Sequence, residues 1–381
     1  MKIKIARIIT RMDLGGAQRA VLHLSKELDP EKFEQIVITG EGGLLLSELP
    51  PVQHYVVPEL VRHVGPALLW TDLKAISRVC RILRNFDPLI VHTHTPKAGI
   101  VGRWAAWLAD VPRVVHTYHG FGFSAERRSW QRVFYMGAEK LTARITHQFV
   151  AVSYQNRLQA EECRMFPRGQ CEVIRSGVDF SGFQTLSVDK IKKKMELGIC
   201  SSDKVVGVVA SFTPAKGLHH FLDAARKICD EIPDVCFLMV GDGALRPHLE
   251  QQIRQLQLGA RVKMLGWRRD IPELLQLFDV FLLTSLWEGL PRSLVEARFC
   301  GVPSVASNVD GVSEVVHDGK SGYLVVPGDT ETMAKRVSQL LRDESLRHRM
   351  GQFGKLGIEE FSAQKMLRDY SQLYKNITLG L

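Results

Sequence analysis

The strongest structural signal in the chain is DVFLLTSLWEGLPRSLVEARFCGVPSVAS, residues 279–307. An apolar run at 279–284 and a β-branched run at 302–306 are typical of buried parallel strands. The segment between them predicts a helix over 292–300, and Pro291 suits its first position, where no backbone N–H is needed. Strand, helix and strand in this order predict a β-α-β unit.

Units of this kind run along nearly the whole chain. The strands expected in the first half are residues 2–10, 35–40, 89–93, 113–118 and 148–153. Those expected in the second half are 204–211, 235–241, 261–265, 279–284, 302–306 and 322–326. Helical patterns lie between them at 17–28, 217–230, 244–257, 271–277 and 292–300. The 381 residues therefore predict an α/β protein with two doubly wound parallel sheets, joined at the polar stretch 175–184.

Composition excludes several classes of protein. Hydrophobic residues make up 45% and charged residues 24% of the chain, which excludes disordered, coiled-coil and collagen-like proteins. No apolar run approaches the ~18 residues of a membrane-spanning helix, and Arg7, Arg11 and Asp13 interrupt any signal-peptide stretch. The seven cysteines include no Cys-x-x-Cys pair, so neither a zinc knuckle nor a disulfide framework is expected. We expect a soluble, cytoplasmic protein.

Positive charge is concentrated in the first half. Residues 1–180 hold 24 Lys and Arg against 17 Asp and Glu, whereas the remainder holds 26 against 24. An anionic partner would therefore meet the first half. Two segments there, 103–107 and 127–148, alternate basic and apolar residues and could rest on an anionic membrane surface. An ordinary solvated helix face explains them equally well, so peripheral membrane attachment stays open, and no nucleic-acid partner is expected.

Ligands of such sheets bind at the carboxyl ends of the strands, so the turns after 279–284 and its neighbours are the candidate site. The amides of Gly289 and Leu290 precede a helix N-terminus, which is a natural seat for a diphosphate. The carboxylates of Glu288 and Glu296 would repel phosphate and are suited to accept hydrogen bonds from sugar hydroxyls. The alternative is that they are a helix-start charge and a solvated helix position.

Three further turns carry candidate residues. Lys216 precedes a helix, where a cation is unfavourable unless an anion lies nearby, so it predicts phosphate contact. Gly15 and Gly16 follow the first strand and let the backbone approach a ligand, although a simple flexible turn is the alternative. The turn Gly241-Asp242 is also explained by backbone geometry alone.

The segment 266–270, with Arg268, could serve a nucleobase, and a packed Trp267 explains it equally well. Four histidines end two strands of the first half: His92, His94, His116 and His119. No acidic residue joins them with ligand spacing and no Asp-x-Asp occurs, so no metal site and no cofactor are expected. His119 is the better candidate, because it could bond a sugar hydroxyl or a leaving phosphate.

These turns, in this order, resemble glycosyltransferase family 4, whose members are retaining enzymes with two facing Rossmann-like domains, the GT-B fold. The resemblance covers essentially the full chain. It is carried by VHTHTPKAGIVGRWAA, HTYHGFGF, PAKG, GDGALR, LWEGLPRSLVEA and DGVSEVVHDGKSGYLVVPGD. The two glutamates around Gly-Leu-Pro are the specific element, and the histidine segments look most like bacterial surface-polysaccharide members.

The resemblance implies transfer of a sugar from a nucleotide-diphosphate sugar with retained configuration and without an essential metal. A UDP-sugar donor and a glycan or lipid-linked acceptor of bacterial polysaccharide or lipopolysaccharide synthesis are favoured. It further implies an acceptor domain at 1–180, a donor domain at 181–361 and a helix within 362–381 that returns to the first domain.

The resemblance also assigns roles to individual residues. Glu288 would face the donor hexose and Glu296 would hold the ribose. Lys216 would bind the diphosphate, His119 would be the active-site histidine and Gly16 would lie at the donor.

One position departs from the family pattern. Family members commonly carry an arginine five residues before the lysine, where this chain has Ser211. The loss of a charge-assisted pair would cost on the order of 1.5–3 kcal/mol of donor binding. Arg292 or Arg246 could substitute, or the protein is a weak or inactive member. A nucleotide-sugar epimerase of the same architecture is a second alternative, whereas a dehydrogenase is disfavoured because no G-x-G-x-x-G follows the first strand.

Overall fold

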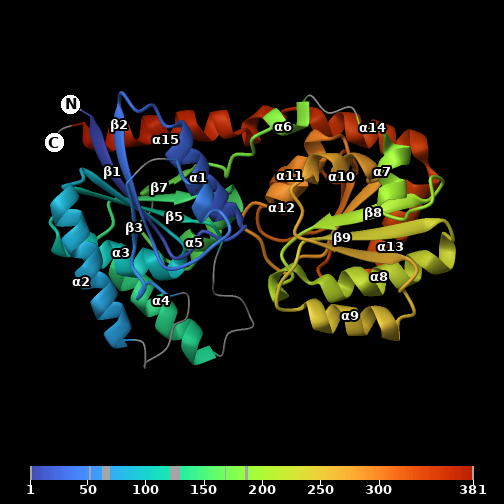
Figure 1. The fold of residues 1–381 in the computed structure, drawn as a ribbon, viewed down its shortest axis with the longest axis horizontal. Helices are drawn as coiled ribbons and strands as arrows, with labels where there is room; N and C mark the ends of the chain where they lie inside the picture. Colours follow the sequence, from blue (N-terminus) through green and yellow to red (C-terminus); the bar gives the residue numbers. More distant parts are fainter. Residues whose placement is uncertain are drawn as a thin grey trace. The chain divides into compact units, whose positions relative to one another are not determined.

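The computed structural model describes residues 2–50, 53–61, 69–120, 129–167, 169–184 and 188–379. The chain divides into two compact units. The first unit comprises Met1–Gly177 and Ala363–Leu381, and the second comprises Val178–Ser362. Each unit contains its own parallel sheet (Figure 1).

The sheet of the first unit has the strand order β3-β2-β1-β4-β5-β6-β7. Its strands are β1 (Ile3–Ile9), β2 (Phe33–Thr39), β3 (Gln53–Val56), β4 (Ile90–His94), β5 (Arg113–Tyr118), β6 (Gln148–Ala151) and β7 (Cys171–Val173). All neighbours pair in parallel; Ile5, for example, lies opposite Gln35 on β2 and Ile90 on β4. The helices of this unit are α1 (Gly16–Glu27), α2 (Leu69–Phe86), α3 (Pro96–Leu108), α4 (Ser129–Ala143), α5 (Tyr154–Glu162) and α15 (Ala363–Thr378).

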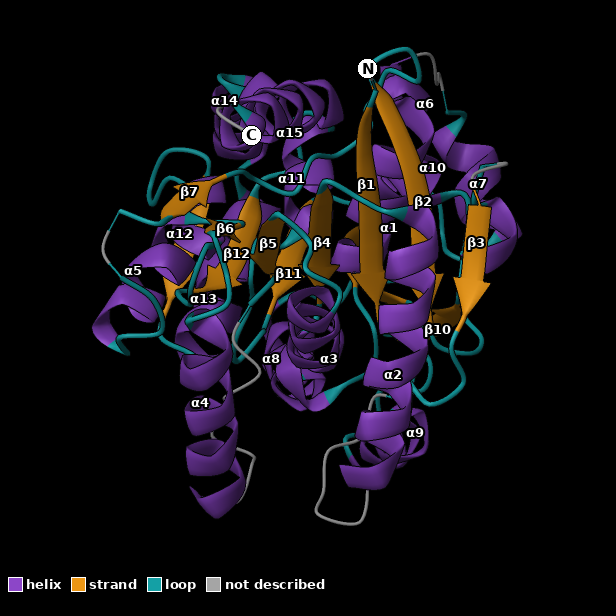
Figure 2. Cartoon of the chain, turned by 90° about the vertical axis from the view of Figure 1, so that its left-hand side faces the viewer, coloured by secondary structure: helices purple, strands orange, loops and turns teal. Residues whose placement is uncertain are grey.

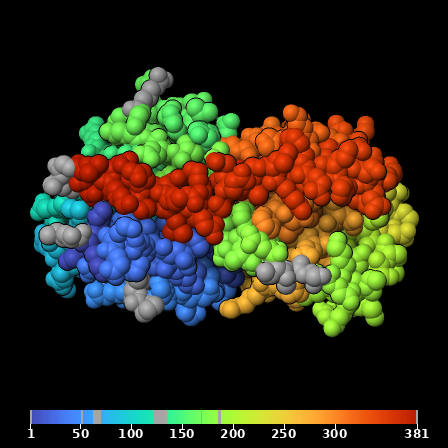
Figure 3. Space-filling view, turned by 90° about the horizontal axis from the view of Figure 1, so that it is seen from above, coloured from blue at the N-terminus to red at the C-terminus, as the bar shows by residue number. Residues whose placement is uncertain are grey.

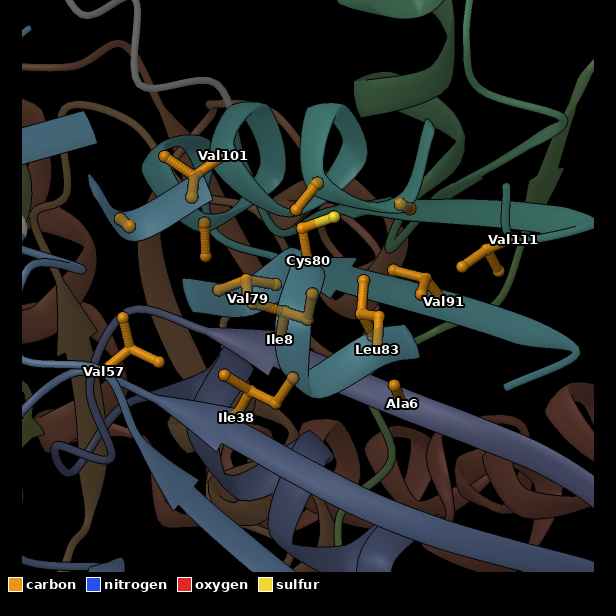
Figure 4. Packing of buried hydrophobic residues seen from close by; sticks show 14 of the residues in the cluster. Ala6, Ile8, Ile38, Val57, Val79, Cys80, Leu83, Val91, Val101 and Val111 are labelled. Carbon is orange, nitrogen blue, oxygen red and sulfur yellow. The ribbon is translucent and has the colours of Figure 1, made fainter. Parts of the chain in front are cut away.

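Helices cover both faces of this sheet. On one face, α2 and α3 bury Val79, Leu83 and Val101 against the strands (Figure 4). On the other face, α1 and the C-terminal helix α15 contribute Leu24 and Leu373 to a second cluster. Helix α15 lies beside α1 at the surface, where the red end of the chain meets its blue beginning (Figure 3). A segment from the far end of the sequence therefore completes the first unit.

The sheet of the second unit has the order β10-β9-β8-β11-β12-β13. Its strands are β8 (Lys204–Val209), β9 (Val235–Val240), β10 (Val262–Gly266), β11 (Val280–Leu283), β12 (Ser304–Ser307) and β13 (Gly322–Val325). Its helices are α6 (Ser181–Gln184), α7 (Lys190–Glu196), α8 (Leu218–Glu231), α9 (Arg246–Gln255), α10 (Ile271–Leu277), α11 (Arg292–Phe299), α12 (Val312–Val315), α13 (Thr330–Arg342) and α14 (Glu344–Lys355). Every residue of β9 is buried, as expected for a central parallel strand.

The predicted α/β class with two doubly wound parallel sheets is confirmed. The sequence did not reveal β3 and β7, which have four and three residues. Both lie at sheet edges and are partly exposed, so they lack the apolar run by which buried strands are recognised. Each sheet reverses its winding direction once, between β1 and β4 and between β8 and β11. The carboxyl ends of strands at such a reversal form the ligand-binding crevice of doubly wound sheets.

Candidate functional site

The reversal point of the second sheet brings the loops after β8 and β11 into direct contact. The Leu286 amide donates to the Ala215 carbonyl at 2.8 Å, and Thr284 Oγ1 donates to the Lys216 carbonyl at 3.1 Å. Gly217 has φ +52°, and a Cβ at this position would lie 2.3 Å from the Thr284 carbonyl oxygen. The close approach of the two loops therefore requires glycine here.

Lys216 and Glu288, predicted from separate turns, form an ion pair at this point. Lys216 Nζ lies 2.7 Å from Glu288 Oε1 and 2.8 Å from Oε2. Ser285 Oγ donates a further hydrogen bond of 2.6 Å to Oε1. Glu288 is only 7% exposed, so these bonds offset much of the cost of burying its charge.

The backbone of Glu288 is held from a third loop. Its amide donates to Asp310 Oδ2 at 2.6 Å, and Asp310 follows the neighbouring strand β12. Burial, together with the negative charge of Glu288, raises the pKa of Asp310. The sequence analysis missed Asp310 and Ser285. The available signal was a polar residue before Gly311, in the turn after the strand predicted at 302–306.

The remaining residues of this loop lie next to helix α11. Leu290 is buried and Gly289 is partly buried. Pro291 precedes the helix with an extended backbone, so the expectation that it would take the first helical position was wrong by one residue. The predicted reason still applies, because Pro291 stands where the helix has no use for an N–H. Glu296 lies within α11 and is partly buried.

The Gly241-Asp242 turn after β9 joins the loops of β8 and β9. Gly241 has φ +131°, and a Cβ there would lie 1.9 Å from the Ala210 carbonyl oxygen. The Asp242 carboxylate accepts from Arg246 at 2.9 Å. Arg246 also donates to Glu250 at 2.9 Å, so both acidic neighbours already balance its charge.

Arg268 makes a bidentate ion pair with Asp270, at 2.8 and 2.6 Å. The hydrogen bond to Asp270 raises the pKa of Arg268, and the Arg268 hydrogen bond lowers the pKa of Asp270. Lys193 also approaches Asp270, at 2.8 Å. The Arg268 guanidinium is therefore bound by the Asp270 carboxylate.

The reversal point of the first sheet carries the paired glycines. Gly15 is the N-cap of α1 and Gly16 is its first residue. On the neighbouring strand, Thr95 caps α3 with φ +68°, a backbone conformation that is strained for a threonine. Thr95 Oγ1 lies 2.5 Å from Thr10 Oγ1, which joins the ends of β1 and β4.

Three of the four histidines contact one another at the same end of the first sheet, whereas His116 bonds Thr93 Oγ1 at 2.8 Å and packs against Gly99 of α3. His119 Nε2 lies 3.0 Å from His94 Nδ1, and the rings of His94 and His92 are 4.0 Å apart. Burial lowers the pKa values of His92, His94 and His116 well below their usual range, and neighbouring cationic groups lower them further. These three side chains are therefore neutral at pH 7. In the ranges that the structure describes, no three His, Cys, Asp or Glu side chains are grouped to hold a metal ion.

A directional chain of hydrogen bonds connects His92 to the C-terminal helix. Arg7 can only donate, and its guanidinium donates to the Tyr374 hydroxyl at 2.7 Å. Arg7 Nη1 also lies 3.4 Å from His92 Nδ1, which favours the tautomer in which Nδ1 accepts; Tyr374 then donates to Nδ1 at 2.7 Å and His92 Nε2 donates to Thr117 Oγ1 at 2.7 Å. The charge of Arg7 thus sets the tautomer of His92.

The structure corrects one interpretation of the first unit. Arg103 is fully buried and pairs with Glu139 at 2.5 Å, so it cannot belong to a membrane-facing surface. Trp104 is partly buried and donates to Thr142, whereas Trp107 is 54% exposed. Among the described helices, none combines the length and the apolarity that crossing a membrane requires.

Comparison with known proteins follows the division into two units. The model of Glycosyltransferase Family 4 matches residues 14–181, and that of Glycosyl transferases group 1 matches residues 189–356. The UDP-Gal:alpha-D-GlcNAc-diphosphoundecaprenol alpha-1,3-galactosyltransferase of Escherichia coli is 34% identical over 351 residues, which are 91% of this chain and 89% of the relative. The chain belongs to glycosyltransferase family 4.

Other relatives include the capsular polysaccharide biosynthesis glycosyltransferase CapM of Staphylococcus aureus, which is 25% identical over 90% of this chain and 90% of the relative. The N-acetyl-alpha-D-glucosaminyl L-malate synthase of Bacillus anthracis is 27% identical over 99% of this chain and 98% of the relative. The solved structure of Anabaena HepE with UDP and glucose superposes with a TM-score of 0.84, at 25% identity, over 98% of this chain and 100% of HepE. The predicted family, activity class and GT-B fold are therefore confirmed.

Proposed function

We propose that this glycosyltransferase transfers a hexose from a UDP-sugar to a lipid-linked glycan, with retained configuration and without an essential metal, in bacterial polysaccharide synthesis. The observation that carries the proposal is the Lys216–Glu288 pair at the reversal point of the second sheet. The name of the Escherichia coli relative and the UDP complex of HepE support the nucleotide and the acceptor class.

In the second unit, binding of the donor is an exchange of partners. The diphosphate would pair with the Lys216 ammonium, which lies 2.7 Å from Glu288 Oε1. The amides of Gly289 and Leu290 add donors at the start of α11. Glu288 is thereby freed to accept from hydroxyls of the hexose, and Glu296 accepts from the ribose. Fixed donors around the diphosphate stabilise the charge that develops as the sugar–phosphate bond breaks.

A second cation has to stand in for the arginine that Ser211 replaces. Arg246 lies in the first turn of α9, after β9, and pairs with Asp242 and Glu250. Arg292 begins α11, directly after the loop of Gly289 and Leu290. We therefore assign this role to Arg292.

The first unit would bind the acceptor. The glycine turn of Gly15 and Gly16 and the side chain of His119 lie at the carboxyl ends of its strands. His94 orients the imidazole of His119 through the 3.0 Å hydrogen bond. His119 would then hold a hydroxyl of the sugar or the departing phosphate.

A membrane surface is a further proposed partner of the first unit. Helices α2, α3 and α4 form the outer layer on one face of its sheet (Figure 2). Trp70 on α2 is 76% exposed, and exposed apolar side chains also lie on the other two helices. Those side chains are Trp107 and Leu108 on α3 and Val133 and Leu141 on α4.

Positive charge accompanies these apolar side chains. The exposed residues of α2 include four cations, Lys74, Arg78, Arg81 and Arg84. Apolar side chains among cations suit an anionic bilayer.

The transfer proposal is tested with UDP-galactose, UDP-glucose and UDP-N-acetylglucosamine, each with an undecaprenyl-diphosphate-linked N-acetylglucosamine acceptor. We expect transfer from one of them, an α-linkage identified by NMR, and no loss of rate with EDTA. A sugar isomerised in the absence of acceptor would instead indicate an epimerase. Donor binding without any transfer would indicate a non-catalytic homologue.

Membrane binding is tested by sedimentation with vesicles containing phosphatidylglycerol. We expect binding at low salt that weakens as ionic strength rises, because salt screens the cations of α2. A variant with Arg78 and Arg81 changed to glutamine should bind more weakly, while the change Arg254→Gln on α9 of the second unit serves as the control. Absence of binding at low salt would contradict the proposal.

A further inference from the structure

The loop after β12 contains a residue in an unusual backbone conformation. Asp310 has φ +38°, in the left-handed region that glycine adopts freely and most other residues avoid. Gly311, the next residue, has an ordinary φ of −74°. The chain therefore places a side chain where glycine would be less strained, at a cost on the order of 1 kcal/mol. A contact of that side chain must offset the cost.

The contact is the hydrogen bond from the Glu288 amide to Asp310 Oδ2. Its length is 2.6 Å. It fixes the peptide from which the Glu288 side chain departs. That side chain is then held at its other end by Lys216 and Ser285. Glu288 is thus fixed at both its backbone and its carboxylate.

The negative charge of Asp310 is not the useful property of this contact. Burial raises the pKa of Asp310 and the nearby Glu288 carboxylate adds to this, whereas the hydrogen bond from the Glu288 amide lowers it, so on balance the surroundings disfavour the charged form. An amide oxygen would accept the same hydrogen bond without repulsion, and asparagine tolerates a positive φ at least as well as aspartate. The position of the Glu288 backbone therefore depends on a side-chain oxygen at residue 310 that can accept a hydrogen bond, and not on a negative charge there.

We propose that Asp310 is a positioning residue that sets the place of the Glu288 carboxylate and so determines how the sugar half of the donor is held. This inference rests on the proposed function of Glu288. The three residues come from three adjacent strands, because Lys216, Glu288 and Asp310 follow β8, β11 and β12 in sheet order. If Lys216 alone held Glu288, the loop that carries Glu288 could move together with Lys216 when this lysine binds phosphate. The hydrogen bond to Asp310 prevents this movement.

The test uses Asp310→Gly, which relaxes the backbone and removes the acceptor, and Asp310→Asn, which keeps the acceptor. The change Asn308→Ala, at an exposed position of the same loop, is the matched control. Affinities for UDP and for UDP-galactose are measured by calorimetry, and kcat and KM by the transfer assay. UDP lacks the sugar, so it reports diphosphate and nucleoside binding without the proposed contact between the hexose and the Glu288 carboxylate.

We expect Asp310→Gly to bind UDP within about twofold of the wild type, to bind UDP-galactose about tenfold more weakly and to lose about tenfold or more in kcat. Asp310→Asn and Asn308→Ala should stay within about threefold on every measure. A merely structural role would weaken UDP and UDP-galactose binding together and lower the melting temperature. That result, or failure of Asp310→Asn to rescue, would overturn the inference.

Hydrogen exchange of the Glu288 amide separates this inference from the proposed function. The amide should be protected in the wild type and in Asp310→Asn and should exchange at least tenfold faster in Asp310→Gly. Unchanged protection in Asp310→Gly would overturn the inference whatever the activity. A wild-type protein that binds no UDP-sugar would instead contradict the proposed function, and the exchange result would still decide whether Asp310 holds Glu288.

Discussion

The two units share a fold but place their polar groups differently. The first unit buries charged and titratable side chains within its core, among them Arg7, His92, Arg103 and Glu139. In the second unit, the buried arginines Arg298 and Arg347 donate hydrogen bonds to backbone carbonyls. The polar side chains of its candidate site instead lie in the loops after β8, β11 and β12. Groups in loops can exchange partners with a ligand, whereas a buried network is fixed. We infer that a fixed buried network supports the proposed site of the first unit, whereas the Lys216–Glu288 pair of the second unit lies in loops that can exchange partners.

The largest expected effect concerns the buried pair of the first unit. Glu139→Ala leaves the Arg103 guanidinium buried without its carboxylate and removes the acceptor of the Tyr118 hydroxyl. We expect a loss of about 3–5 kcal/mol in the free energy of unfolding, measured with denaturant. Glu331→Ala, which removes an exposed pair with Lys227, should cost less than about 1 kcal/mol. If both variants lost a similar amount of unfolding free energy, the proposed difference between the buried network and exposed ion pairs would be contradicted.

The next largest effect concerns the exchangeable pair of the second unit. Lys216→Ala removes the proposed diphosphate cation, and we expect the transfer rate to fall about 100- to 1,000-fold. Lys227→Ala, on the helix that begins just after Lys216, should leave the rate unchanged. Retention of a near-native rate in Lys216→Ala would remove this residue from the site.

Acid should destabilise the first unit selectively. The folded-state pKa values of His92, His94 and His116 lie below the unfolded value of about 6.5, so the unfolded chain binds more protons as pH falls. Their contribution to the free energy of unfolding is therefore fully present above pH 6.5. Below pH 6.5 it is lost, by on the order of 1 kcal/mol per histidine per pH unit.

Hydrogen exchange at pH 7.5, 6.5 and 5.5 would measure this effect unit by unit. His92→Gln should reduce the pH slope by about a third, because it removes one of the three groups. In the second unit, His219 and His248 are exposed. Burial lowers the pKa of His220 and His317 there, but less than that of the three fully buried histidines, so this unit should show a smaller loss and serves as the internal comparison. An equal loss in both units would show that carboxylates or net charge cause it.

The smallest effect concerns the link between the C-terminal helix and the histidines. Tyr374→Phe removes the hydroxyl that joins Arg7 to His92 and should cost about 1–2 kcal/mol of unfolding free energy. Tyr154→Phe, at an exposed tyrosine, should change it by less than about 0.5 kcal/mol. A Tyr374→Phe protein as stable as the wild type would mean that the apolar contacts of α15 are sufficient.

Most of the fold was predictable because buried parallel strands and amphipathic helices have strong periodic signals. The turn residues Lys216 and Glu288 were predictable for the same reason, since strand ends mark the site in a doubly wound sheet. Arg103 was wrongly predicted to be exposed, because a basic residue on a helix usually is. Its burial is stabilised by the ion pair with Glu139, which lies 36 positions later in the sequence. Asp310 was missed because its contact spans two loops 22 positions apart.

Local patterning thus determined the class of fold, the order of the buried strands along the chain and the turns proposed as the site, because periodicity and turn chemistry act over a few residues. Contacts between separate strands were decided by the folded sheet. The order β8-β11-β12 brings Lys216, Glu288 and Asp310 together, and the docking of α15 brings Tyr374 to His92. Such contacts depend on which strands become neighbours, and a buried polar group acquires its partner and its charge state only when that neighbourhood forms.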